Sequence, residues 1–322
     1  MSGRFNNRNY LAVFLILAVV YIVTKLPSVK RADRSLNTDI VHIDTSQVSS
    51  MEIYPAGEKE TMLEFTRTKG AWWVKKDEVI AAANIRSFEG LLAEIQNLEA
   101  EQLVARSPER WAEYNVNDSL GTRIIVKEGD KITLDLVVGR FNYTPPPQNS
   151  YNPYGQNQVS GKTYVRLWAG DEVYSVDGFL SMSINRPFDQ WRNQTITRFS
   201  TSGLSRIAFD YPADSGFIAE RTDAGWMVAG ILADSTSMAG YLNRISSKSH
   251  QQFADHFQPG PEPDYRIVFE GDNMQQQFVR AYVQADGNMV LNSSINPETW
   301  FSVARDGLFG DLYPGYEELL PH

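Results

Sequence analysis

The spacing of hydrophobic and polar positions changes along the chain, and these changes predict the order of its elements. In residues 51–57 and 61–68 apolar and polar side chains alternate, which indicates two strands joined by a turn, and Trp72 and Trp73 begin a third strand. In residues 83–95 the apolar positions recur every three or four residues, which predicts an amphipathic helix. Its apolar stripe consists of Ile85, Phe88, Leu91, Leu92, Ile95 and Leu98.

More strands are expected after this helix. Ser107 is a candidate N-cap and Pro108 suits the first helical position, so a short second helix is predicted there. The segments 122–128 and 131–139 then flank a Glu-Gly-Asp turn, and 163–176 has the pattern of a further hairpin. Strands, one helix and more strands predict an α+β module whose sheet is covered by a helix on one side.

The second half of the chain repeats parts of the first half in the same order. Residues 233–245 share Ala, Gly, Leu and Ile with 83–95 at a constant offset of 150, and Arg67, Thr68 and Trp72 recur 154 positions later. Shorter matches follow downstream: 123–130 with 266–273, 164–166 with 278–280, and 183–185 with 294–296. Collinear matches of this kind predict two tandem copies of the module.

Two kinds of residue at matching places suggest a structural role. Trp72 and Trp226 are expected to belong to a shared core rather than to a ligand cage. Gly90 and Gly240 lie in the middle of the predicted helices, where Gly costs about 1 kcal/mol relative to Ala. We expect close packing of each helix on its sheet to be the reason.

Residues 141–162 have no hydrophobic periodicity and contain four Pro, four Asn and three Tyr. They are predicted to be a loop inserted into the first copy, which adds little to the core and whose deletion is nearly neutral for stability. One interpretation is a tolerated insertion. The other is a partner-binding loop that uses Tyr143, Tyr151 and Tyr154, because tyrosine offers large contact area at low entropic cost.

The N-terminus contains an uncharged apolar run from Tyr10 to Thr24. To Leu26 it would span roughly 25 Å as a helix, and the residues after it offer no convincing signal-peptide cleavage site. We therefore expect an uncleaved transmembrane anchor, Tyr10–Leu26. The basic residues on its two sides slightly favour a cytoplasmic body. The absence of Cys and the abundance of Asn, Gln, Ser and Tyr favour an extracytoplasmic one, which is the orientation expected here.

These segments give a domain plan: residues 1–26 form the tail and anchor, 27–47 a linker, 48–192 the first module, 193–202 a second linker and 203–322 the second module. The fold class is thus α+β, with two tandem sheet-plus-helix modules after a transmembrane helix.

The composition of the chain excludes several kinds of catalytic and binding site. With no Cys, thiolate metal sites and a Cys nucleophile are excluded, and a net charge of -9 without a long basic run argues against nucleic-acid binding. His250 and His256 are six residues apart, which is not the spacing of two metal ligands on one helix face. No nucleophile elbow, phosphate-binding loop or zinc-protease motif occurs, so no catalytic residue, metal ligand or cofactor is predicted. A carboxylate pair of the glycosidase type stays open, because the sequence does not reveal distances between carboxylates.

Several segments together resemble a bacterial family catalogued as domain-of-unknown-function 4340. They are the N-terminal anchor, "GAWWV" at 70–74, the helix at 83–95, "WAEYNV" at 111–116 and "TYVRLWAGDEVYSVDGF" at 163–179. The similarity begins near residue 48 and covers most of the chain. The resemblance implies a membrane-anchored protein encoded near ABC-transporter and gliding-type auxiliary proteins, and it carries over no catalytic residue. The long segment 141–162 departs from the family pattern.

From these observations we expect a non-enzymatic scaffold or accessory subunit of a membrane complex, associated with an ABC transporter or the envelope. It would be a single-pass protein of a bacterial inner membrane with protein partners and an extracytoplasmic body. The alternatives are a binding module that holds an envelope polymer or small ligand between its two modules, and a carboxylate-dependent hydrolase.

Overall fold

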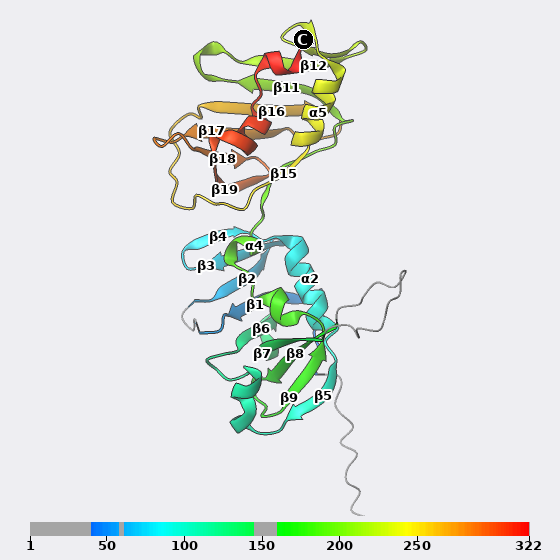
Figure 1. The fold of residues 1–322 in the computed structure, drawn as a ribbon, viewed down its shortest axis with the longest axis vertical. Coiled ribbons are helices and arrows are strands. Elements are labelled where there is room, and N and C mark those ends of the chain that lie inside the picture. Colours follow the sequence, from blue (N-terminus) through cyan, green and yellow to red (C-terminus); the bar gives the residue numbers. More distant parts are fainter. Residues whose placement is uncertain (1–39, 58–60, 145–159, 322) are drawn as a thin grey trace, which may run out of the picture.

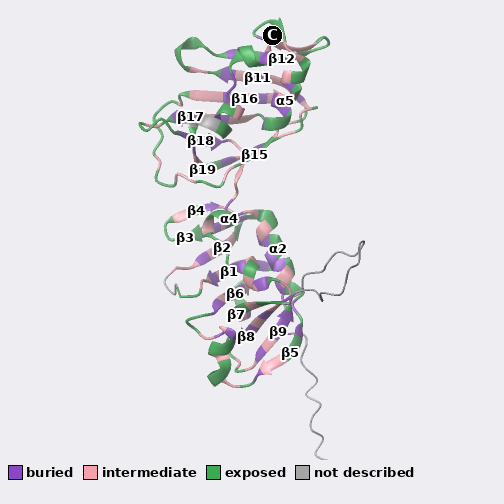
Figure 2. Cartoon of the chain, in the orientation of Figure 1, coloured by how far each residue is buried: buried purple, intermediate pink, exposed green. Residues whose placement is uncertain are grey.

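The protein is mostly β with few helices and contains two large antiparallel sheets, each forming one lobe of an elongated body (Figure 1). The structure, a computed structural model, describes residues 40–57, 61–144 and 160–321. Figure 2 shows buried residues along the strands of both sheets and exposed residues on the turns. Each lobe has its own large hydrophobic core, and we call the lobes the first and second modules.

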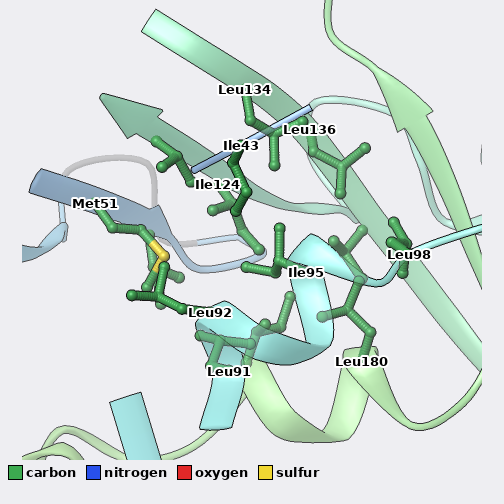
Figure 3. Packing of buried hydrophobic residues seen from close by; sticks show 14 of the residues in the cluster. Ile43, Met51, Leu91, Leu92, Ile95, Leu98, Ile124, Leu134, Leu136 and Leu180 are labelled. Atoms are coloured by element: carbon green, nitrogen blue, oxygen red, sulfur yellow. The ribbon is translucent and has the colours of Figure 1, made fainter. Parts of the chain in front are cut away.

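The first module contains a nine-stranded sheet in the order β4-β3-β2-β1-β6-β7-β8-β9-β5. Its strands are β1 (Val48–Tyr54), β2 (Leu63–Thr68), β3 (Ala71–Lys76), β4 (Val79–Ala82), β5 (Ala100–Ala105), β6 (Thr122–Glu128), β7 (Lys131–Thr144), β8 (Ser160–Leu167) and β9 (Val173–Asp177). Helix α2 (Ile85–Gln96) confirms the predicted amphipathic helix, with Asn84 accepting from the Ser87 N–H as N-cap. Five of the six stripe residues are buried, and Figure 3 shows Leu91, Leu92 and Ile95 against the sheet, whereas Ile85 is 45% exposed.

The second module contains an eight-stranded sheet in the order β14-β13-β12-β11-β16-β17-β18-β19. Its strands are β11 (Leu204–Asp210), β12 (Phe217–Thr222), β13 (Gly225–Val228), β14 (Ile231–Leu232), β16 (Tyr265–Gly271), β17 (Gln277–Val283), β18 (Met289–Ser293) and β19 (Asn296–Val303). Helix α5 (Ser235–Ile245) buries Met238, Leu242 and Ile245 as expected, together with Tyr241. Asp234 is its N-cap.

The two sheets differ at one edge. In the first module β5 follows the helix and pairs with β9, so it covers that edge of the sheet. In the second module the strand after the helix, β15 (Ser247–Ser249), instead pairs with β10 (Thr195–Arg198) in a separate two-stranded sheet. The β19 edge is thereby left to face β4 of the first module, and the two sheets meet edge to edge at these strands.

Short helices complete both modules. They are η1 (Pro108–Tyr114), α3 (Leu180–Ile184), α4 (Phe188–Trp191), η2 (Pro212–Asp214), η3 (Arg305–Phe309), α6 (Gly310–Leu312) and η4 (Tyr316–Leu319). The predicted helix after Ser107 is the 3-10 helix η1, with Pro108 in its first turn, although the Ser107 side chain makes no capping hydrogen bond. Among the helices of the described chain, none is long and apolar enough to cross a bilayer. The predicted anchor, Tyr10–Leu26, lies outside those residues.

Both predicted linkers contribute residues to the cores. Ile40, Val41 and Ile43, which fall within the expected linker 27–47, are buried in the core of the first module. Ile196, within the expected linker 193–202, is buried in the core of the second module. In both segments only a few apolar residues stand among polar ones. Such a pattern is too short to predict a strand by itself.

The sequence matches upstream of residue 131 fall on corresponding elements: on strands with the same place in the two sheet orders, and on the helices α2 and α5. Arg67 lies opposite Trp72 between β2 and β3, and Arg221 lies opposite Trp226 between β12 and β13. The two downstream matches were wrong. Residues 164–166 lie in β8 but 278–280 lie in β17, whose counterpart by sheet order is β7. Residues 183–185 are the end and C-cap of α3, whereas 294–296 are the turn after β18 and the first residue of β19.

The expected reason for the mid-helix glycines was also wrong. Apart from neighbouring residues and the nearby backbone of the helix itself, no described atom lies within 4 Å of a Cβ placed at Gly90, and at Gly240 the nearest is a guanidinium nitrogen of Arg244 at 3.7 Å. Both glycines therefore face away from the tight packing of helix on sheet, and their cost to the helix is not offset there.

The predicted loop 141–162 is shorter than expected. Residues 141–144 and 160–162 extend β7 and β8 as a paired hairpin, and the Phe141 ring stacks on Phe179 with centroids 5.2 Å apart. The alternation was not recognised because these strand ends are only four and three residues long and adjoin the Pro- and Asn-rich residues 145–159. The remaining residues, 145–159, including Tyr151 and Tyr154, lie outside the described part of the chain.

This hairpin predicts that Gly161→Ala destabilises the protein, by about 1–3 kcal/mol, because a Cβ there would overlap the Phe141 ring. The matched control is Gly170→Ala in the β8–β9 turn, where the nearest atom would be 3.7 Å away and the change should stay within about 1 kcal/mol of wild type. Urea unfolding measures both. Equal stability of the two variants would show that 161 lies in a tolerant loop after all.

Candidate inter-module cleft

The chain passes from the first module to the second along the edge of strand β4. The Asn84 N–H donates to the Trp191 carbonyl and the Asn193 N–H donates to the Ala82 carbonyl, both at 2.7 Å. Between them Arg192 forms an isolated β-bridge with Ala83. Because Trp191 is fully buried in the first core, this connection is fixed to the first module up to Asn193.

Arg192 joins the two modules through a buried ion pair. Its side chain is 2% exposed, and its two terminal nitrogens donate to the carboxylate of Asp255 in the second module at 2.8 and 2.5 Å. The guanidinium also lies 3.7 Å from the centroid of the Phe253 ring. A bidentate pair of this kind is directional, so it fixes how the second module is oriented on the first.

A cleft of about 540 Å³ opens beside this junction. The first module contributes residues at the start of α2, and the second contributes residues of β10, β15 and the turn after β18. The cleft is lined by Ala83, Asn84, Ile85, Arg86, Ser87, Asn193, Gln194, Thr195, Arg198, Ser249 and Ile295. It therefore combines two arginines with neutral hydroxyl and amide groups, and no carboxylate is among its lining residues.

Two further cavities occupy corresponding places in the two modules. Each lies between the helix and the Arg-Trp pair of the neighbouring hairpin: Arg67 and Trp72 in the first module, Arg221 and Trp226 in the second. In both, the arginine donates to a backbone carbonyl before the first strand of the sheet, that of Ser46 or Ser202. Trp72 is buried in its core and Trp226 is half-buried, which fits their predicted structural role.

Carboxylates do not converge in the cavities found in the described structure. Each of five cavities is lined by one carboxylate at most: Asp234, Glu220, Asp118 and Glu89 line one cavity each, and the inter-module cleft has none. Within the described residues, no group of three or more His, Asp or Glu side chains is placed to hold a metal ion. His250 instead contacts the Ser302 carbonyl at 2.9 Å through Nε2.

The segment 163–179, which carries much of the family resemblance, contains a structural arginine. Arg166 is buried, donates to the carbonyls of Val116 and Trp168, and lies 3.7 Å from the ring centroid of Trp111. Burial lowers the pKa of Arg166 from its usual value. Its contacts all stay within the first module, so this motif stabilises the β8–β9 region.

Tyr143, the one predicted partner-binding tyrosine that the structure describes, does not line the cleft. Tyr143 lies in β7, is 50% exposed and stands opposite Gly161 in β8. A Cβ at Gly161 would lie 3.3 Å from the ring of Phe179, which is exposed like Met182 three residues later. Sequence reasoning missed both the Arg192–Asp255 pair and the cleft arginines, because the residues involved come from opposite modules. The one local signal was a basic residue directly after an aromatic one in "FDQWR", which is weak by itself.

Comparisons with known proteins give one match. A family model described as a domain of unknown function (DUF4340) matches residues 72–267, which is more than half of the chain. The match runs from β3 of the first sheet to β16 of the second and so includes Arg192, Asp255 and both cleft arginines. A search of curated proteins and a search of solved structures found no match.

The ion pair of Arg192 predicts that two nearby carboxylates contribute unequally to the stability of the protein. Asp255→Ala should lower the free energy of unfolding by about 3 kcal/mol, because it leaves the Arg192 charge buried without its main partner. Asp189→Ala is the control: this carboxylate is 52% exposed and 3.4 Å from the same guanidinium, so its loss should cost under about 1 kcal/mol. Chemical denaturation compares them. Equal losses would contradict the role given to Asp255.

Proposed function

The chain belongs to the family described as a domain of unknown function (DUF4340), and from that premise we propose that it is a non-enzymatic accessory subunit of a membrane complex. In this proposal Tyr10–Leu26 anchors the chain in a bacterial inner membrane. The two modules lie outside the cytoplasm and present a surface to protein partners of an ABC transporter or an envelope assembly.

An exposed aromatic patch carries this proposal. Tyr143, Phe179 and Met182 are 50%, 38% and 59% exposed, and the Phe179 ring packs on Phe141 of the β7–β8 hairpin. Exposed aromatic and Met side chains that lie together are typical of protein interfaces, where they supply most of the buried apolar area. The patch lies at the base of the segment 145–159, which carries Tyr151 and Tyr154.

We further propose that the two modules arose by duplication of one α+β unit. The shared strand order β4-β3-β2-β1-β6-β7-β8-β9 and β14-β13-β12-β11-β16-β17-β18-β19 supports this, as do the N-caps Asn84 and Asp234. A register irregularity between the first and third residue of β1 and of β11 recurs as well. Irregularities at the same place in two sheets are hard to explain by packing alone.

The inter-module cleft favours a second candidate function, a binding module that holds a ligand between its two halves. Clefts between packed domains are frequent ligand sites, and this one is lined by polar groups from both sides. The third interpretation, a carboxylate-dependent hydrolase, needs two carboxylates near one substrate, and each cavity described above has at most one.

The proposed topology predicts that a Cys introduced at Ser235, an exposed position at the start of α5, reacts with a membrane-impermeant maleimide in intact spheroplasts. Because the chain has no other Cys, labelling reports this site alone. Labelling that occurs only after lysis would place the body in the cytoplasm and refute the topology.

The proposed patch predicts that Met182→Ser removes a co-purifying protein when the full chain is isolated from detergent-solubilised membranes, because an apolar contact is lost. Ile132→Ser is the control, since Ile132 is similarly exposed, at 53%, but lies at the other end of β7. Quantitative mass spectrometry and a melting curve accompany each variant. If both variants keep every partner at wild-type levels, the patch is not the interface.

A further inference from the structure

The guanidinium groups of the two arginines of the inter-module cleft have no side-chain partner among residues 40–57, 61–144 and 160–321. Of the arginines whose side chains the structure describes, Arg86, Arg106 and Arg198 are those whose guanidinium makes no ion pair, hydrogen bond or ring contact. Two of these three line one cavity. Apart from Arg106, the other arginines whose side chains the structure describes are paired or stacked, so the cleft holds two of the three that are not.

The residues around these arginines do not neutralise their positive charge. The protein carries 39 acidic and 30 basic residues, yet none of the acidic residues is among those lining the cleft. The lining groups that accompany the arginines are neutral and able to donate hydrogen bonds, such as the Ser87 and Thr195 hydroxyls and the Gln194 amide. A site with two cations and neutral donors but no carboxylate has the composition expected for binding an anion.

From this we infer that the inter-module cleft binds a ligand through an oxyanion, a phosphate or carboxylate group held by Arg86 of the first module and Arg198 of the second. Guanidinium groups suit this task because they present parallel N–H donors to two oxygens at once. The cleft volume of about 540 Å³ has room for a small molecule or for one repeat of a polymer. This inference deepens the second candidate function and is independent of the membrane-complex proposal.

The site also links the ligand to the arrangement of the modules. Arg86 lies in the first turn of α2, whereas Arg198 ends β10, which pairs with β15 of the second module. A ligand that contacts both arginines binds only when the modules stand in the orientation fixed by Arg192 and Asp255. Ligand binding therefore stabilises that orientation.

The test is isothermal titration of the full chain in detergent with pyrophosphate and, separately, with citrate, at constant ionic strength set by chloride. Saturable binding of either anion is expected, and the tighter of the two identifies a phosphate-bearing or a carboxylate-bearing ligand. Arg86→Gln and Arg198→Gln should each weaken it about tenfold, as expected for the loss of a charge-assisted hydrogen bond.

Arg106→Gln provides the matched control, since it removes the same charge from the third unpaired arginine, which lies outside the cleft. It should leave the affinity unchanged. Absence of saturable binding for both anions would overturn the inference, and so would an equal loss of affinity in Arg106→Gln, because that would indicate a general effect of net charge. Melting curves of the three variants verify that each is folded. The readout differs from co-purification, so failure here leaves the membrane-complex proposal to its own test.

Discussion

The arrangement of the two modules depends on burying one positive charge between them. Arg192 follows the last residue of the first core, Trp191, and its side chain cannot reach solvent. A buried guanidinium is costly unless it is paired, and Asp255 meets that need from the second module. Because the pair is bidentate and the Phe253 ring contacts the same group, the second module has one favourable orientation on the first.

A second constraint acts on the sheets themselves. An antiparallel sheet has two edges with unpaired backbone groups, and proteins cover or block them. Here β5 covers the β9 edge of the first sheet, whereas the corresponding edge of the second sheet, β19, faces β4. The different course of one strand after the helix, β5 or β15, thus decides which edge is available for docking. The cleft with Arg86 and Arg198 is a consequence of that docking, since its walls come from both modules.

Local features of the fold could be predicted from the sequence, because their causes are local. The apolar stripe of α2 and the alternation of β2 follow from short spacings, and the stripe recurs in α5. Prediction failed where the hydrophobic pattern was weak or where the interacting residues are far apart in the sequence. The β7–β8 extension is short and adjoins the Pro- and Asn-rich residues 145–159, so it resembled a loop, and the match at 164–166 rested on three residues. The cleft joins residues 112 positions apart, at 86 and 198, which no periodicity connects.

The central claim is that the described chain is one body in which a buried ion pair fixes two modules and thereby forms the cleft. Because the chain has no Cys, spin labels can be placed at Lys131→Cys at the start of β7 and Thr236→Cys on α5, both exposed positions in different modules. Double electron–electron resonance then measures the distribution of distances between the two labels. The account predicts one narrow distribution that broadens when Asp255 is changed to Ala. A distribution that is already broad in the otherwise unchanged chain would contradict it.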